Sequence, residues 1–115
     1  MNVERVRELC LNHAHVEECT PFGDDNLVFK VGGKIFALLS LGLERRVNLK
    51  CDPERSIELR ERYPDAVIPG YHMNKKHWNT IIFDMLDDKI ISELITHAYT
   101  LVYNALPKKV KEQLS

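Results

Sequence analysis

Hydrophobic residues recur at helical spacing near the start of the chain. Val3, Val6 and Cys10 follow an i, i+3, i+7 pattern, while charged residues fill most positions between them. This periodicity predicts an amphipathic helix over residues 3–13, with one face buried against the rest of the protein. Pro, Gly and two Asp residues follow at 20–25, where a loop is expected because these residue types favour turns.

Apolar and polar residues then alternate, as they do in half-buried strands. The alternation predicts strands at 27–31, 34–40 and 46–51, with a tight turn at Gly32-Gly33 between the first two. The third strand would separate its side chains onto two faces, with Val47, Leu49 and Cys51 on one and Arg46, Asn48 and Lys50 on the other. Its polar face is therefore expected to be cationic.

The second half of the chain returns to helical signals. Asp52-Pro53 is typical of a helix start, because Asp caps the first turn and Pro fits the first helical position. The expected elements are a helix to residue 63, an extended segment at 66–69, a strand at 77–84, a long helix after Asp87 and a basic tail or helix at 108–115. This order predicts an α+β fold: one domain, 1–115, with N-terminal and C-terminal helices packed on one face of an antiparallel sheet.

The charge is balanced overall and uneven along the chain. The 115 residues include 16 Lys and Arg against 17 Asp and Glu, a net charge of -1, which excludes a protein coated in basic residues. Residues 1–25 carry a net charge of -4, whereas residues 26–51 hold five basic residues and one acidic residue, a net charge of +4. The predicted strands are therefore the basic part of the molecule.

The three cysteines predict a reducing compartment. Cys10, Cys19 and Cys51 are odd in number and form no C-x-x-C pair, unlike the even sets of secreted disulfide scaffolds. The first residues lack the apolar core of a signal peptide, and no apolar run reaches the ~18 residues of a membrane span. We therefore expect a cytoplasmic protein with no membrane partner.

Catalytic and metal-binding motifs are not recognisable in the sequence. Cys10, His13, His15 and Cys19 are possible zinc ligands, but their spacing matches no established zinc finger. The serines lack a nucleophile elbow, and no H-E-x-x-H motif is present. The sequence predicts a protein that is not an enzyme and that has no cofactor and no metal site.

The segment 71–78 combines basic and aromatic residues and allows two interpretations. As a ligand site, Asn74, Lys75 and Lys76 would contact phosphates. The aromatic residues of the segment could stack on a ligand or form hydrogen bonds with it: Tyr71, His72, His77 and Trp78. As a purely structural segment, Asn74 would stabilise a turn and Trp78 would anchor the start of a strand in the core.

Several motifs resemble the MmcQ/YjbR family, in order and over nearly the whole chain. They are Pro21-Phe22-Gly23, the segments 28–31 and 33–37, the run 47–53, the run Pro69-Gly70-Tyr71-His72-Met73-Asn74-Lys75-Lys76-His77-Trp78, and the ending 98–109. The resemblance implies an α+β fold similar to CyaY/frataxin. It also implies the "double wing" DNA binding proposed for these bacterial cytoplasmic proteins. Iron binding does not follow from such a fold alone.

The basic strands and the resemblance together predict a non-enzymatic protein that binds DNA. We expect contacts mostly with phosphates, hence weak sequence specificity and strong salt dependence, with a monomer favoured. The expected contact residues are Lys30, Lys34, Arg46, Asn48, Lys50, Asn74, Lys75, Lys76 and His77. They should converge on one exposed face, with the acidic helices turned away. The alternative is a protein-interaction or small-ligand module that uses the same surface.

Overall fold

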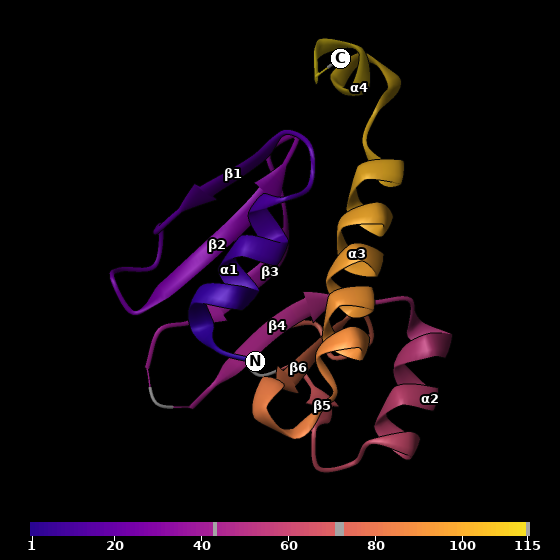
Figure 1. The fold of residues 1–115 in the computed structure, drawn as a ribbon. Helices are drawn as coiled ribbons and strands as arrows, with labels where there is room; N and C mark the ends of the chain where they lie inside the picture. Colours follow the sequence, from indigo (N-terminus) through magenta and orange to yellow (C-terminus); the bar gives the residue numbers. More distant parts are fainter. Residues whose placement is uncertain (43, 71–72, 115) are drawn as a thin grey trace.

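The computed structural model describes residues 1–42, 44–70 and 73–114. Six strands form one antiparallel sheet: β1 (Val16–Cys19), β2 (Asn26–Val31), β3 (Lys34–Ser40), β4 (Arg46–Lys50), β5 (Val67–Pro69) and β6 (Trp78–Ile82). The other elements are α1 (Val3–Leu11), α2 (Pro53–Arg62), the short 3-10 helix η1 (Phe83–Met85), α3 (Asp88–Ala105) and α4 (Lys108–Leu114). The strand order is β1-β2-β3-β4-β6-β5, which leaves β1 and β5 at the edges (Figure 1).

The register separates the sheet into two faces. Leu39, Val47 and Ile81 are neighbours across β3, β4 and β6, so they share one face, which we call the inner face. Leu38 pairs with Asn48, and Asn48 pairs with Thr80, on the opposite or outer face. The predicted alternation in β4 is confirmed, because Val47 and Leu49 are buried while Arg46, Asn48 and Lys50 are only half-buried.

Helices α1 and α3 cover the inner face of the sheet (Figure 1). The main hydrophobic core joins Val6 and Cys10 of α1 and Ile95 of α3 to the inner-face residues of the strands. Burial in this core raises the pKa of the Cys10 thiol to about 12. The α+β fold with N-terminal and C-terminal helices on one face of an antiparallel sheet is therefore confirmed. None of the helices in the described ranges is long and apolar enough to cross a membrane.

Two elements differ from the sequence-based expectation. The first helix ends at Leu11 instead of residue 13, and the strand β1 follows at Val16–Cys19, where none was predicted. This strand has four residues with no apolar alternation, and pairing with β2 alone makes it a strand. The strand expected at 77–84 is shorter, Trp78–Ile82, because η1 follows it directly.

The last helix packs against the hairpin between β2 and β3. Both turn glycines have positive φ, as the predicted tight turn requires. A Cβ atom added to Gly32 would lie 2.6 Å from Leu106 Cδ1 and 3.1 Å from Val110 Cγ1, whereas nothing lies within 4 Å of the same position at Gly33. The absence of a side chain at Gly32 therefore allows α4 and the residue before it to reach this turn.

Candidate functional site

The ends of four central strands lie together at one end of the sheet. Because neighbouring strands are antiparallel, the end of β2, the start of β3, the end of β4 and the start of β6 fall on the same side. Most of the basic residues that the sequence singled out lie at these strand termini or in the turns next to them. We call this region the basic end, and its lysines are Lys30, Lys34, Lys50, Lys75, Lys76, Lys108 and Lys109.

Lys30 and Lys50 lie on the outer face at the basic end. Lys30 of β2 pairs with Ile35 of β3. The register between β3 and β4 puts Lys50 level with Phe36, the next residue of β3. Two strand spacings then put the two lysine backbones about 10 Å apart. The Nζ atom of Lys50 lies 5.4 Å from the ring centre of Trp78, a cation–π contact that holds the cation at the strand end.

The turn at 74–77 brings two further lysines to this end. The Asn74 side chain accepts a hydrogen bond from the Lys76 backbone N–H (2.9 Å), and the His77 carbonyl accepts one from Cys51 N–H (2.8 Å). The second bond ties the turn to the residue after β4. Lys75 and Lys76 are exposed, while His77 is half-buried. Asn74 thus has the turn-stabilising role that the structural interpretation predicted.

Trp78 is buried, as the structural interpretation also predicted. Its side chain is 8% exposed, at the start of β6. The register places it opposite Lys50, on the outer face, so its ring supports Lys50 and lies outside the main core cluster. Tyr71 and His72, two of the predicted stacking residues, lie outside the described residues.

Arg60 of α2 fixes the turn at 74–77 from the side of the helix, a role that was not predicted from the sequence. Its Nε donates to Asn79 Oδ1 (2.8 Å), and its Nη2 donates to the Trp78 carbonyl (3.2 Å) and to the Lys75 carbonyl. Asn79 in turn donates to the buried Ser56 hydroxyl (3.2 Å), which links β6 to α2. In the sequence, Arg60 looks like an ordinary solvated cation in the last turn of a helix, so nothing there marks this role.

The C-terminal helix adds basic residues that were not among the predicted contacts. Lys34 is exposed beside the Gly32-Gly33 turn, and α4 packs against the same turn. Lys108 and Lys109, in the first turn of α4, are exposed. The sequence places these residues about 75 positions after Lys34, and only the tertiary structure brings the two segments together.

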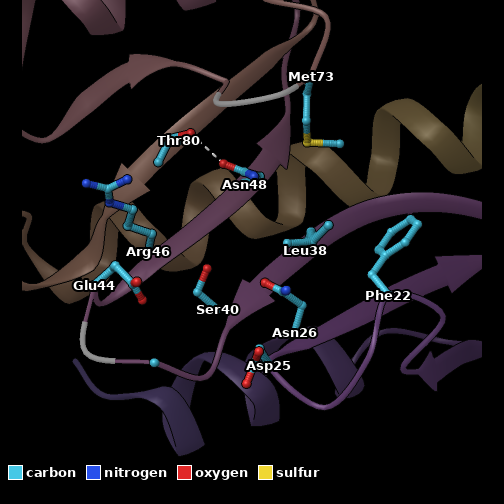
Figure 2. A pocket seen from close by; sticks show the side chains of 11 residues that line it. Phe22, Asp25, Asn26, Leu38, Ser40, Glu44, Arg46, Asn48, Met73 and Thr80 are labelled. Atoms are coloured by element: carbon cyan, nitrogen blue, oxygen red, sulfur yellow. Dashed lines mark hydrogen bonds between the residues drawn. The ribbon is translucent and has the colours of Figure 1, made fainter.

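Two of the predicted residues lie elsewhere on the outer face. Arg46 begins β4, at the end of the sheet opposite the basic end, and Asn48 lies in the middle of the strand. Both line a hollow of about 680 Å³ on the outer face (Figure 2). The other lining residues are Phe22, Asp25, Asn26, Leu38, Ser40, Gly42, Glu44, Met73 and Thr80. The predicted residues therefore divide between the basic end and this hollow.

Acidic residues share the outer face, contrary to the expected separation of charge. Asp25 and Glu44 line the hollow together with Arg46. Glu17 of β1 is the cross-strand neighbour of Lys30. Of the two acidic helices, α1 lies on the inner side of the sheet as expected, and its Arg7 binds Glu18 through two hydrogen bonds of 2.5 and 3.0 Å. Helix α2 instead begins three residues after Lys50 and contacts the turn at 74–77 through Arg60. The acids on the outer face come from β1 and from loops.

His97 connects α3 to the start of α2. Its Nε2 accepts a hydrogen bond from the backbone N–H of Asp52 (3.2 Å), so the ring must be neutral at this nitrogen. Burial lowers the pKa of His97 below its usual 6.5, and Arg55 lowers it further. Burial also lowers the pKa of His13, which stacks on Tyr99 with 4.6 Å between ring centres.

We therefore expect the protein to lose stability as the pH falls below about 6.5. In that range the unfolded chain takes up protons on both histidines, while the folded protein resists protonation, so unfolding becomes more favourable. Urea unfolding at pH 7.5 and 5.5 should give a lower midpoint at pH 5.5. The double variant His13→Gln, His97→Gln should show a smaller difference, because glutamine can accept the same hydrogen bond without titrating. An unchanged difference in this variant would contradict the assignment.

No group of three or more His, Cys, Asp or Glu side chains in the described ranges is placed to hold a metal ion. Of the four possible zinc ligands in the sequence, Cys10 lies in the core and His13 is stacked on Tyr99. His15 has a φ of 62° in the turn before β1. Cys10 and His13 therefore have local structural roles.

Comparison with known proteins identifies relatives over almost the full length. The Escherichia coli O157:H7 protein YbdF is 39% identical over 116 residues, covering 96% of this chain and 92% of the relative. The protein YjbR of Escherichia coli K12 is 30% identical, covering 99% of this chain and 98% of the relative. Both matches include the strands and turns that form the basic end.

Solved structures with the same fold are known. The crystal structure of Deinococcus radiodurans protein DR2400, which has a DUF419 domain, matches with a TM-score of 0.90 at 37% identity, covering 98% of this chain and 87% of that one. A Pseudomonas syringae protein matches with a TM-score of 0.74 at 27% identity, covering 89% of this chain and 99% of that one. A family model described as YjbR matches residues 11–101. The chain therefore belongs to the YjbR family, which its sequence motifs had indicated.

Proposed function

We propose that this protein is a non-enzymatic, cytoplasmic nucleic-acid-binding protein that contacts phosphates, most directly those of DNA, through its basic end. The observation that carries the proposal is the placement of seven lysines at the same end of one sheet. They come from β2, β3, β4, the turn before β6 and α4, which are segments distributed along the whole chain. Lysines gathered in this way offer several cations to a regularly spaced row of phosphates.

The spacing of the lysines suits a phosphate backbone. Alternate residues of a strand are about 6–7 Å apart, and the separation of about 10 Å between Lys30 and Lys50 spans one or two phosphates. The cation–π contact with Trp78 restrains Lys50, so less side-chain freedom is lost when it binds a phosphate. Such contacts carry little sequence information, so specificity should be weak.

The position of the acidic residues is compatible with binding at this end. Glu4 and Glu8 belong to α1, on the far side of the sheet, and Glu18 is neutralised by Arg7. On the outer face, Glu17 is the acidic residue that pairs directly with one of these lysines, Lys30. Phosphates would therefore approach the turn at 74–77, the hairpin and α4, away from β1.

Binding to a fluorescent duplex at several salt concentrations tests the proposal. The slope of log affinity against log salt should flatten by about two units in the double variant Lys75→Ala, Lys76→Ala, because about one counterion is released for each phosphate neutralised. The matched control is Arg5→Ala, Lys89→Ala, which removes the same charge from exposed positions on α1 and α3. Its slope should stay close to that of the wild type.

Two results would overturn the proposal. One is absence of duplex binding at low salt. The other is a salt slope that flattens equally in both double variants, because binding would then depend on the net charge of the protein and not on the lysines of the basic end. An acidic protein partner, the alternative use of the same surface, would then be the function to test with the same pair of variants.

A further inference from the structure

We propose that the hollow on the outer face binds one unpaired nucleotide, with the base inside and the phosphate at the rim. The proposal deepens the nucleic-acid-binding function and rests on it for the strand that would supply the nucleotide. It accounts for a part of the outer face that phosphate binding alone leaves unexplained, since Glu44 lies beside Arg46 and Asp25 lines the same hollow (Figure 2). A nucleotide contains a planar base with hydrogen-bonding edges and an anionic phosphate, and the hollow has matching groups for both.

The hollow has the size of a small-molecule site. Its volume of about 680 Å³ falls in the range of about 300–1,000 Å³ that is typical of pockets for small organic ligands. A base paired within a duplex cannot leave its stack to enter such a hollow without the cost of unpairing, whereas a base of a single strand can. The shape of the site therefore favours unpaired nucleotides.

The floor of the hollow offers hydrogen-bonding groups in a fixed orientation. The Thr80 hydroxyl donates a hydrogen bond to Asn48 Oδ1, which is drawn in Figure 2. The carbonyl oxygen of the Asn48 side chain therefore faces Thr80. The Asn48 amino group is then available as a donor to a ligand. Asn26 supplies a second carboxamide and Ser40 a hydroxyl across the hollow. Carboxamides can pair with the edges of bases through one donor and one acceptor.

Two apolar side chains form the walls above this floor. Phe22 is 63% exposed in the loop before β2, and Met73 extends towards the hollow from the other side (Figure 2). Stacking of a planar base on an exposed phenyl ring is favourable, because it removes the apolar ring from water and because every base has a π-face. The methionine thioether is flexible and also packs well against aromatic rings.

The charged residues at the rim match the amino groups of a base and the phosphate. Arg46 has no ion-pair partner among the residues that the structure describes, so its guanidinium can bind a phosphate oxygen. Carboxylates accept hydrogen bonds from the exocyclic amino groups of bases, a role that Asp25 and Glu44 can fill. Their negative charge also repels further phosphates, which directs the rest of a strand towards the basic end.

Affinity measurements with three probes test the proposal: a 12-nucleotide single strand, the matching duplex and free AMP. The variant Phe22→Ala should weaken single-strand binding by about 5- to 150-fold, since one stacked base is worth about 1–3 kcal/mol. Its duplex affinity should remain that of the wild type. Ile57→Ala is the matched control, because Ile57 is a similarly exposed apolar residue (57%) on α2. It should change neither affinity.

The side-chain amide resonances of Asn26 and Asn48 provide a second readout, which reports on the hollow directly. They should shift when single strand is added and stay in place in Phe22→Ala at the same ligand concentration. The same shifts with AMP would identify a free nucleotide as a sufficient ligand. Shifts with the single strand alone would identify the strand as the source of the nucleotide, and both results support the proposal.

The outcomes separate this proposal from the proposed function. Equal affinity for single strand and duplex, with no effect of Phe22→Ala, would overturn the nucleotide site while leaving phosphate binding at the basic end in place. If the double variant Lys75→Ala, Lys76→Ala has the same salt slope as the wild type while AMP still shifts the amide resonances, the proposed function is overturned and the nucleotide site remains. Amide resonances that move with none of the three probes would overturn the nucleotide site.

Discussion

Replacing Arg60 with alanine is expected to lower the free energy of unfolding by roughly 2–4 kcal/mol, a large effect for one residue of a small domain. The guanidinium donates to three acceptors on β6 and the turn before it. One of them, Asn79 Oδ1, belongs to a residue that is 1% exposed, so water cannot replace the lost donor. A buried acceptor without a donor carries the full cost of its desolvation.

The variant should also weaken nucleic-acid binding if the proposed function is correct. The turn at 74–77 would lose the contact that fixes the Lys75 carbonyl, so Lys75 and Lys76 would have to be ordered on binding. Arg60→Lys provides a comparison at constant charge. An ammonium group cannot reproduce the planar fork that reaches all three acceptors, so we expect an intermediate loss of stability.

Denaturant unfolding of the three proteins measures this effect. The control is Arg62→Ala, two residues later on α2, where the exposed guanidinium contacts only the Tyr63 ring at 5.5 Å among the interactions that the structure describes. It should change stability by less than about 1 kcal/mol. A stability of Arg60→Ala equal to that of Arg62→Ala would show that the hydrogen bonds to β6 contribute little.

Gly32→Ala is expected to destabilise the protein by roughly 2–4 kcal/mol, and Gly33→Ala by roughly 1–2 kcal/mol. Both glycines have positive φ, 58° and 81°, so both changes carry the strain of a left-handed conformation. Only at position 32 would the new methyl group meet Leu106 and Val110, with Leu106 Cδ1 2.6 Å away. The difference between the two variants therefore measures the packing of the hairpin against the C-terminal segment.

The same pair of variants tests whether α4 contributes to the basic end. Displacement of α4 in Gly32→Ala would move Lys108 and Lys109 away from Lys34 while leaving every charge present. We expect a weaker duplex affinity at low salt in Gly32→Ala than in Gly33→Ala, both measured well below their unfolding temperatures. Equal stabilities and equal affinities in the two variants would contradict the packing of α4 on this turn.

Local patterns were sufficient to predict most of the secondary structure. Asp52-Pro53 and Asp87 begin their helices where the capping rule places them, and the Asp52 side chain accepts hydrogen bonds from the Glu54 and Arg55 backbone N–H groups at 3.1 Å. The Gly32-Gly33 turn and the two faces of β4 also follow from neighbouring residues alone. Strand β1 was missed because its pairing partners lie nine to fifteen residues away, in β2.

The part of the candidate site that depends on neighbouring residues could also be predicted from the sequence. The sequence by itself determined which strands are basic, and an alternating strand necessarily places Arg46, Asn48 and Lys50 on one face. It also determined the family, through motifs that keep their order along the chain. These properties depend on residue identity and short spacing.

Only the tertiary structure decided how these residues are grouped. Antiparallel pairing brings four strand ends together, which groups Lys50 with the other lysines and leaves Arg46 at the opposite end of the sheet. Packing on Gly32 brings α4 to the hairpin. Arg60 became important because the fold of α2 against β6 places three acceptors within its reach. The hollow combines two loops, four strands and Met73 in the same way. Contacts of this kind join residues that are distant in sequence, and the physical reason they form is the burial of the shared core, which no local pattern encodes.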